Sequence, residues 1–261
     1  MRPLAALVRR RFELTVRRPR ELFVPLLTPL LFALVIAPAL KAALHTSAEY
    51  EAFVALGTVG LLVPLNALFA GLSAIGDREG GAQRELLAAP VARPLLVLAN
   101  AAVTLATTSL QIAVLIAAAA LRGIGFHASP TGVLWFAGAV LLLTLAMAAV
   151  AETLASSVPT AEEYTARVPA IAIAPWFLAG SLFPIAALPV AMTWFAKLLP
   201  LTHVLALVRY GMLGDTSGLH QIWGAAADVH AVAFASLGVV ALFASALAAV
   251  AVRSFSRAAV A

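Results

Sequence analysis

Long apolar runs alternate with short charged segments along this chain. The runs without Asp, Glu, Lys or Arg cover residues 22–40, 52–76, 94–121, 132–151, 168–196 and 229–252. A helix needs about 20 apolar residues to cross the hydrocarbon of a bilayer. Because lipid offers open backbone no hydrogen-bond partners, such runs must be helical. The pattern predicts an all-α integral membrane protein with six transmembrane helices, at residues 22–44, 52–76, 95–121, 131–154, 166–186 and 229–252.

Composition supports this class. The chain is 63% hydrophobic and 11% charged, whereas a soluble domain has about 45–50% apolar and about 25% charged residues. It has no cysteine, which excludes a disulfide, a catalytic thiol and a Cys-ligated zinc site. The charged residues that give the net charge of +5 lie between the apolar runs. Their distribution therefore indicates the orientation of the chain in a membrane rather than binding of nucleic acid.

The basic residues predict which ends face the cytoplasm. With the N-terminus inside, all but four of the 17 Lys and Arg residues are cytoplasmic; the exceptions are Lys41, Arg122, Lys197 and Arg209. This bias follows the positive-inside rule and places both termini in the cytoplasm. The first run is interpreted as an uncleaved span, because the basic region extends to Arg20 and the run is longer than a signal core of about 7–15 residues.

The first 20 residues predict an amphipathic interfacial helix. Leu4, Val8, Phe12 and Thr15/Val16 recur at helical spacing, with arginines between them. Such a helix lies along the anionic inner leaflet. The alternative is a disordered basic tail.

The stretch between Val168 and Arg209 is too long for one span, yet two crossings would move the basic C-terminal tail outside. It contains Pro184, Pro189 and Pro200, which break a helix into short pieces. We therefore expect a fifth span followed by a re-entrant segment at residues 187–210, a hairpin of two short helices that enters from the outside. The alternative is a continuous fifth span that ends near Ala196, followed by an external loop.

Two stretches resemble a known family. "DREGGAQRELLAAPVARP" at residues 77–94 is similar to the loop after the second span of ABC-2 type transporter permeases, through Arg78–Glu79, Gly80, Leu86–Leu87, Pro90 and Arg93. The family's C-terminal signature is matched in order by Pro175, Phe177–Leu178, Gly180, Phe183–Pro184, Leu188–Pro189, Pro200, His203 and Arg209. The resemblance covers essentially the whole chain, as one domain, and extends to the branch of daunorubicin-resistance permeases and NodJ-like exporters.

The resemblance implies a permease subunit of an ATP-binding cassette exporter in the bacterial cytoplasmic (inner) membrane. Its partners would be two copies of an ABC ATPase and a second permease copy, in a homodimer or heterodimer. Residues 77–94 would form the coupling helix that receives motion from the ATPase, with Arg78, Glu79, Arg84, Glu85, Leu86, Leu87 and Arg93 as coupling residues. The re-entrant signature would be Phe183, Pro184, Pro189, Pro200, His203 and Arg209.

ATP hydrolysis is expected on the partner. A phosphate-binding loop needs G-x-x-x-x-G-K-[ST], and neither lysine, Lys41 or Lys197, follows a glycine. This chain would bind no cofactor; ATP and Mg would be held by the ATPase subunit.

Polar residues inside the spans are candidates for a translocation path. Asn100, Thr104, Thr107/Thr108 and Gln111 recur on one face of the third span, and Asn66 lies in the second. Such residues either line a path or hydrogen-bond neighbouring helices. Because Ala, Leu and Val dominate the spans, we expect an amphiphilic drug-like or lipid-like cargo. A lipid-linked glycan or polysaccharide, which calls for aromatic and hydrogen-bonding walls, is the alternative.

Intramembrane enzymes and secondary transporters are the rival classes. The histidines, His45, His127, His203, His220 and His230, never form H-E-x-x-H, although an external metal site at these residues is conceivable. Ser73 and Ser181 lack a base, so no catalytic residue and no metal ligand is assigned. Glu152 is the ionisable residue nearest the middle of a run, but it lies at the inner end, whereas ion-coupled transporters keep such groups near the midplane.

Overall fold

The computed structural model describes the chain except residues 1, 18, 83–85, 87, 89–91 and 259–261. Its described residues form helices and connecting segments, without strands. The helices are α1 (Arg2–Val16), α2 (Pro19–Leu31), the π-helix η1 (Phe32–Ile36), α3 (Ala37–Leu44), α4 (Ala48–Gly57), α5 (Val59–Glu79), α7 (Arg93–Leu121), α8 (Pro130–Ser157), α9 (Ala161–Leu178), the 3₁₀ turn η2 (Ile185–Ala187), α10 (Val190–Leu198), α11 (Pro200–Leu213), α12 (Ser217–Trp223) and α13 (Val229–Ala258). The predicted all-α membrane class is confirmed.

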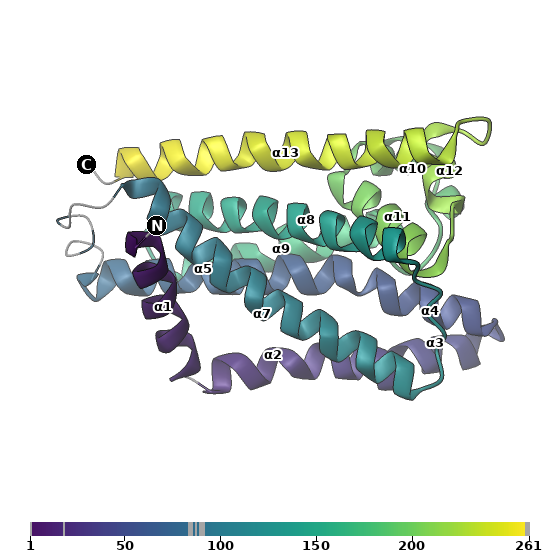
Figure 1. Ribbon diagram of the computed structural model, residues 1–261, viewed down its shortest axis with the longest axis horizontal. Coiled ribbons are helices and arrows are strands. Elements are labelled where there is room, and N and C mark those ends of the chain that lie inside the picture. The colour runs from purple at the N-terminus through teal and green to yellow at the C-terminus, as the bar shows by residue number, and fades with distance from the viewer. Residues whose placement is uncertain (1, 18, 83–85, 87, 89–91, 259–261) are drawn as a thin grey trace.

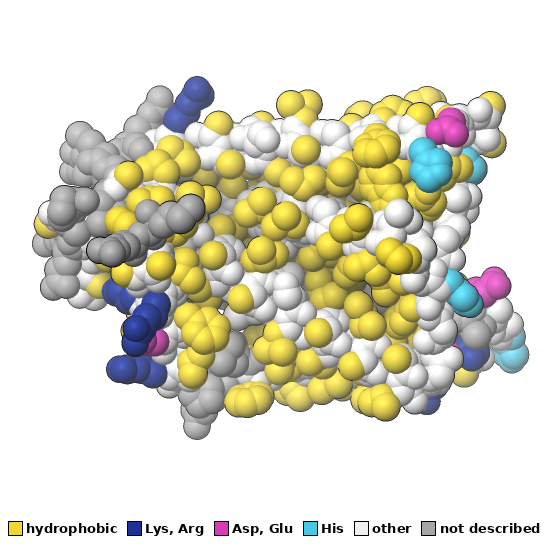
Figure 2. Space-filling model, viewed as in Figure 1, with side chains coloured by type: hydrophobic (Ala, Val, Ile, Leu, Met, Phe, Trp, Pro, Cys, Tyr) yellow, Lys and Arg dark blue, Asp and Glu magenta, His cyan; other side chains and the backbone are white. Residues whose placement is uncertain are grey.

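The long helices lie roughly parallel in one bundle with two distinct ends (Figure 1). The start of α1, the end of α13, the end of α5 and the start of α7 gather at one end, called here the termini end. α10, α11, α12 and the α3–α4 junction lie at the other, the hairpin end. Figure 2 shows a hydrophobic belt between them, with most visible Lys and Arg side chains at the termini end and the visible His side chains at the hairpin end.

Five described helical segments are long and apolar enough to cross a membrane: Pro25–Leu44, Glu49–Glu79, Pro94–Leu121, Pro130–Ser157 and Val229–Ser254. The bent pair α10–α11 would make a sixth. These segments match five of the six expected spans. The expected fifth span, residues 166–186, corresponds to α9, which begins earlier, ends at Leu178 and carries Glu162, Glu163 and Arg167 near its start; α9 is not among the segments that meet these limits of length and charge.

The re-entrant candidate is broken where the prolines stand. Pro184 precedes η2, Pro189 precedes α10, and Pro200 begins α11. Proline has no N–H and a fixed φ, so it starts a helix well and cannot continue one. The two helices α10 and α11 are bent by 81° about Leu199, which makes a right angle rather than a tight hairpin. That the segment enters and leaves on the same side of a membrane stays a prediction.

Glycines let several helices approach closely. A Cβ on Gly211 of α11 would lie 2.4 Å from the Gly132 carbonyl oxygen of α8, and one on Gly132 would lie 2.2 Å from the Gly211 oxygen. A Cβ on Gly57 would lie 2.0 Å from the carbonyl oxygen of Ser181. Small residues at crossings are how membrane helices gain packing contacts without a hydrophobic driving force.

The helix α1 packs against the domain along one face. That face follows Leu4, Val8, Arg11 and Thr15, and Arg11 is 8% exposed. Phe12 and Val16 remain 49% and 48% exposed, and their expected contact with a membrane surface stays a prediction. The buried stripe therefore contains a charged residue, because the domain offers that residue specific polar partners.

Candidate translocation groove

A cavity of about 800 Å³ lies among α1, α2, α5, α7 and α8. Its apolar wall includes Leu62, Leu65, Phe69 and Leu72 of α5. The polar lining consists of Arg10, Arg11 and Thr15 from α1, Thr28 from α2, Asn66, Ser73 and Asp77 from α5, Asn100, Thr104, Thr107 and Gln111 from α7, and Glu152 from α8. This cavity, called the groove from here on, is thus lined by both apolar and polar side chains.

Most predicted path residues meet in one hydrogen-bonded cluster. The Asn66 Nδ2 atom donates to Thr108 Oγ1 at 2.7 Å and to Thr107 Oγ1 at 2.9 Å. Gln111 Nε2 donates to Asn66 Oδ1 at 3.3 Å, and Thr104 contributes its backbone oxygen at 3.3 Å from Asn66 Nδ2. These residues therefore hydrogen-bond α5 to α7, and Asn66, Thr104, Thr107 and Gln111 also line the groove. Passage of cargo along them stays a proposal.

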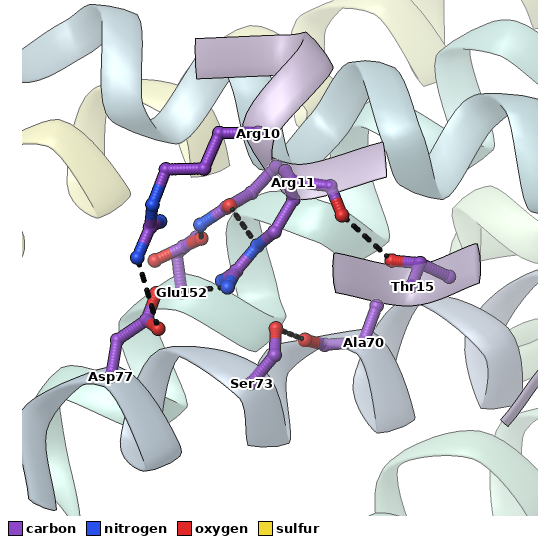
Figure 3. Close-up of polar contacts among 8 residues, drawn as sticks. Arg10, Arg11, Thr15, Ala70, Ser73, Asp77 and Glu152 are labelled. Atoms are coloured by element: carbon purple, nitrogen blue, oxygen red, sulfur yellow. Dashed lines mark hydrogen bonds and ion pairs between the residues drawn. The ribbon is translucent and has the colours of Figure 1, made fainter. Parts of the chain in front are cut away.

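A charged network lies at the termini end of the groove (Figure 3). Arg11 Nη1 donates to Asp77 Oδ2 at 2.8 Å, and Arg11 Nε donates to Asn100 Oδ1 at 2.8 Å. Asn100 Nδ2 in turn donates to Glu152 Oε1. Arg10 faces the same carboxylate, with Nη2 3.9 Å from Asp77 Oδ1. The chain of contacts joins α1, α5, α7 and α8.

The expected coupling residues are only partly described. Arg84, Glu85 and Leu87 lie outside the described residues, while Glu79 is exposed and Leu86 is half-buried. The backbone of Arg93 begins α7. How these residues meet a partner stays a prediction.

Arg78 has a defined structural contact. Its guanidinium donates to the carbonyl oxygens of Ala155 at 2.9 Å, Val158 at 2.8 Å and Pro159 at 3.0 Å. The last carbonyls of a helix lack intrahelical donors and carry negative partial charge, so a guanidinium there stabilises the helix end. The end of α5, which contains the first residues of the expected coupling segment, is thereby fastened to the end of α8.

The re-entrant signature residues divide into buried anchors, exposed positions and the half-buried Pro200. Arg209 is 5% exposed; its Nη2 donates to the carbonyls of Ser181 at 3.0 Å and Phe53 at 3.2 Å, and its guanidinium lies 3.3 Å from the Phe53 ring centroid. The ring nitrogens of His203 lie 3.2 Å from Ser236 Oγ and 3.0 Å from the Lys197 carbonyl. Phe183, Pro184 and Pro189 are exposed.

The conceivable external metal site has no support in the described part of the chain, where no group of three or more His, Asp or Glu side chains is placed to hold a metal ion. His203 is buried because its ring nitrogens contact Ser236 and the Lys197 carbonyl. His45, His127 and His230 are exposed.

Sequence reasoning missed Arg11 and Asp77, and it treated Glu152 as an end-of-run residue. Arg11 belongs to a run of three arginines, so composition alone does not separate it from its neighbours. The available signal was its spacing, which places it between Val8 and Thr15 on one helical face. Asp77 lies opposite that face only because α1 folds back across α5 and α7, which no local pattern encodes.

Together these features define a multi-pass helical membrane protein with a partly polar groove that reaches the end of α5. Residues 2–213 match the family model described as ABC-2 type transporter. The chain is also 27% identical, over 214 residues, to a protein of Porphyra purpurea named "Putative transport permease ycf38", covering 79% of this chain and 72% of that protein. The chain belongs to the ABC-2 type transporter family, whose permeases work with an ABC ATPase.

Proposed function

We propose that this chain is the permease subunit of an ATP-binding cassette exporter that moves an amphiphilic drug-like or lipid-like molecule out of the cytoplasm or the inner leaflet. The groove is the observation that carries the proposal. It combines an apolar wall with a polar stripe inside the hydrophobic belt, and it begins at the termini end beside the expected coupling segment. An amphiphile needs both surfaces.

The same proposal covers orientation and partners. The termini end carries most of the visible basic side chains, which favours a cytoplasmic position in a bacterial inner membrane. Two ATPase subunits would bind ATP and Mg there, and a second permease copy, identical or not, would complete the transporter. The motion would enter at residues 77–94.

A glycan cargo is the weaker alternative. Sugar polymers are usually bound along aromatic faces, and among the described residues that line the groove, Phe69 is the one aromatic side chain. The apolar wall of Leu62, Leu65 and Leu72 suits an acyl or ring system instead.

The proposal is tested with the chain and its ATPase reconstituted in liposomes. The complex should show ATP hydrolysis that rises with an added amphiphile, and the purified chain alone should show none above background. Thr107→Val, which removes a groove hydroxyl at nearly constant volume, should raise the half-maximal cargo concentration about fivefold, as expected for one hydrogen bond of about 1 kcal/mol. Thr165→Val, on exposed α9 surface, is the matched control.

Hydrolysis by a homogeneous preparation of the chain alone would contradict the subunit assignment. Equal half-maximal cargo concentrations for the parent and for Thr107→Val would contradict the proposed contact between the cargo and the polar lining of the groove.

A further inference from the structure

We propose that the groove selects amphiphiles with a positively charged headgroup, and that Glu152 is the residue that recognises the charge. This inference rests on the proposed function, because it names the chemical class of the exported cargo. It is carried by the position of Glu152, by the pairing of the charges around it and by the neutral lining beyond it.

Glu152 is buried inside the domain and still borders the groove. Its exposed fraction is 4%, and it is among the residues that line the cavity. It stands five residues before the end of α8 at Ser157, which corresponds to a depth of about 7–8 Å along the helix. A headgroup that enters from the termini end therefore reaches Glu152 soon after it leaves water.

The neighbouring arginines are engaged elsewhere. Arg11 directs Nη1 to Asp77 and Nε to Asn100, and Arg10 also approaches Asp77. The side-chain partner of Glu152 is the neutral amide of Asn100. Within the described part of the chain, no Lys, Arg or His nitrogen lies within 4.0 Å of the Glu152 carboxylate.

A carboxylate in this position favours binding of a cationic headgroup. Burial of an ionised carboxylate without a directly paired cation costs several kcal/mol. The Asn100 amide and the nearby Arg11 offset part of that cost, but neither makes an ion pair with Glu152. A cargo cation that displaces water from the groove would supply the missing pair, whereas an anionic headgroup would be repelled.

Beyond Glu152 the polar lining is neutral and still offers acceptors. Along α7 this lining continues through Thr104 and Thr107 to Gln111. The helix rises by about 16 Å between Asn100 and Gln111. Gln111 is 4% exposed, and its Oε1 receives no hydrogen bond among the described residues. A hydroxyl or N–H on the cargo would satisfy it. The groove thus matches a molecule with a cation at one end and a donor on its body.

The experiment uses the permease–ATPase complex in liposomes and three probes that share the diphenylhexatriene body: the uncharged parent compound, its cationic trimethylammonium derivative and its anionic propionate derivative. ATP hydrolysis is measured against the concentration of each probe in the bilayer. The parent complex should reach half-maximal stimulation with the trimethylammonium probe at about one tenth of the propionate concentration. Glu152→Gln, which keeps an acceptor for Asn100, should abolish this preference, and Glu152→Asp should retain it.

Glu162→Gln, an exposed acid on α9, is the matched control and should keep the parent preference. Equal stimulation by the three probes, or a preference for the propionate, would overturn the inference and leave the exporter assignment standing. An unchanged preference in Glu152→Gln would also overturn it. Stimulation by none of the probes would contradict the amphiphile exporter itself. The parent series decides the charge preference even if Glu152→Gln fails to assemble.

Discussion

The contact between Arg11 and Asp77 should hold α1 against the membrane domain. The perturbation is a double-mutant cycle: Arg11→Met, Asp77→Asn and the two together. Methionine keeps the apolar stem length of arginine and removes its donors, while asparagine removes the charge of the aspartate at constant size. The cycle separates the pairwise interaction from the loss of packing.

The structure sets the expected size. The Arg11 and Asp77 side chains are 10% and 20% exposed, and the N–O distance is 2.8 Å. A hydrogen bond to a charged group contributes about 1.5–3 kcal/mol. Removing one member of a fully buried pair costs about 3–5 kcal/mol. Here the cost is smaller, because the Asp77 side chain remains partly exposed to solvent and would retain its weaker contact with Arg10. We therefore expect a coupling energy of about 1.5–3 kcal/mol.

The measurement is reversible unfolding in mixed micelles with increasing SDS, with trypsin cleavage within α1 as a local readout. Arg11→Met should lower the free energy of unfolding and speed cleavage after the exposed Arg9. The control is the same cycle at Arg9 and Glu13, whose side chains are 82% and 48% exposed; screened by solvent, it should show no measurable coupling. If the two cycles give the same coupling energy, or if cleavage of α1 is unchanged in Arg11→Met, the anchoring role is wrong.

Three further outcomes are expected. Gly211→Ala should cost about 1–3 kcal/mol of stability, because its Cβ would meet the α8 backbone. Its control, Gly238→Ala, has nothing within 4 Å of the added Cβ and should be neutral or stabilising by up to about 1 kcal/mol. Equal stabilities of the two variants would contradict the close crossing of α8 and α11. Arg78→Met should cost about 1.5 kcal/mol or more and lower transport per ATP hydrolysed; unchanged stability and coupling would refute its role in fastening α5 to α8. Single cysteines at exposed Leu198 and Ser157 should react with impermeant thiol reagents from the outside and from the cytoplasm respectively, and the reverse pattern would invert the proposed topology.

The spans could be predicted because their signal is local. Lipid requires about 20 apolar residues and internal hydrogen bonding, so run length alone locates most of the long helices. The fifth span shows the limit of that rule. Its apolar run begins at Val168, yet α9 starts at Ala161 and includes three charged residues, because a helix can extend beyond the apolar stretch where water or protein receives its polar groups.

Only the part of the groove lining that comes from α7 and from Asn66 could be predicted from the sequence. The 3.6-residue period places Asn100, Thr104, Thr108 and Gln111 on one face of α7. In the structure, Thr108 and Gln111 hydrogen-bond Asn66, whereas Asn100 contacts Arg11 and Glu152. The opposite half depends on how α1 returns across the bundle, so the partners of Arg11 had no sequence signature. The hairpin end poses a different problem. Both α10 and α11 are apolar, but Leu198 is 72% exposed and Leu205 is 0% exposed, and sequence cannot separate burial in lipid from burial in protein because both environments are apolar.

The proposed export cycle has a direction along the bundle. The polar lining of the groove reaches the termini end, where Arg11 of α1 contacts Asp77 of α5. At the hairpin end, residues 201–209 of α11 are all buried, and Arg209 fastens that helix to the carbonyls of Phe53 and Ser181. An exporter built on this groove would load from the termini end and must separate these hairpin-end contacts to release cargo. Because Asp77 is the first residue of the expected coupling segment, motion of that segment would act first on the loading side. Release at the hairpin end would then require the long helices to carry the motion across the bundle.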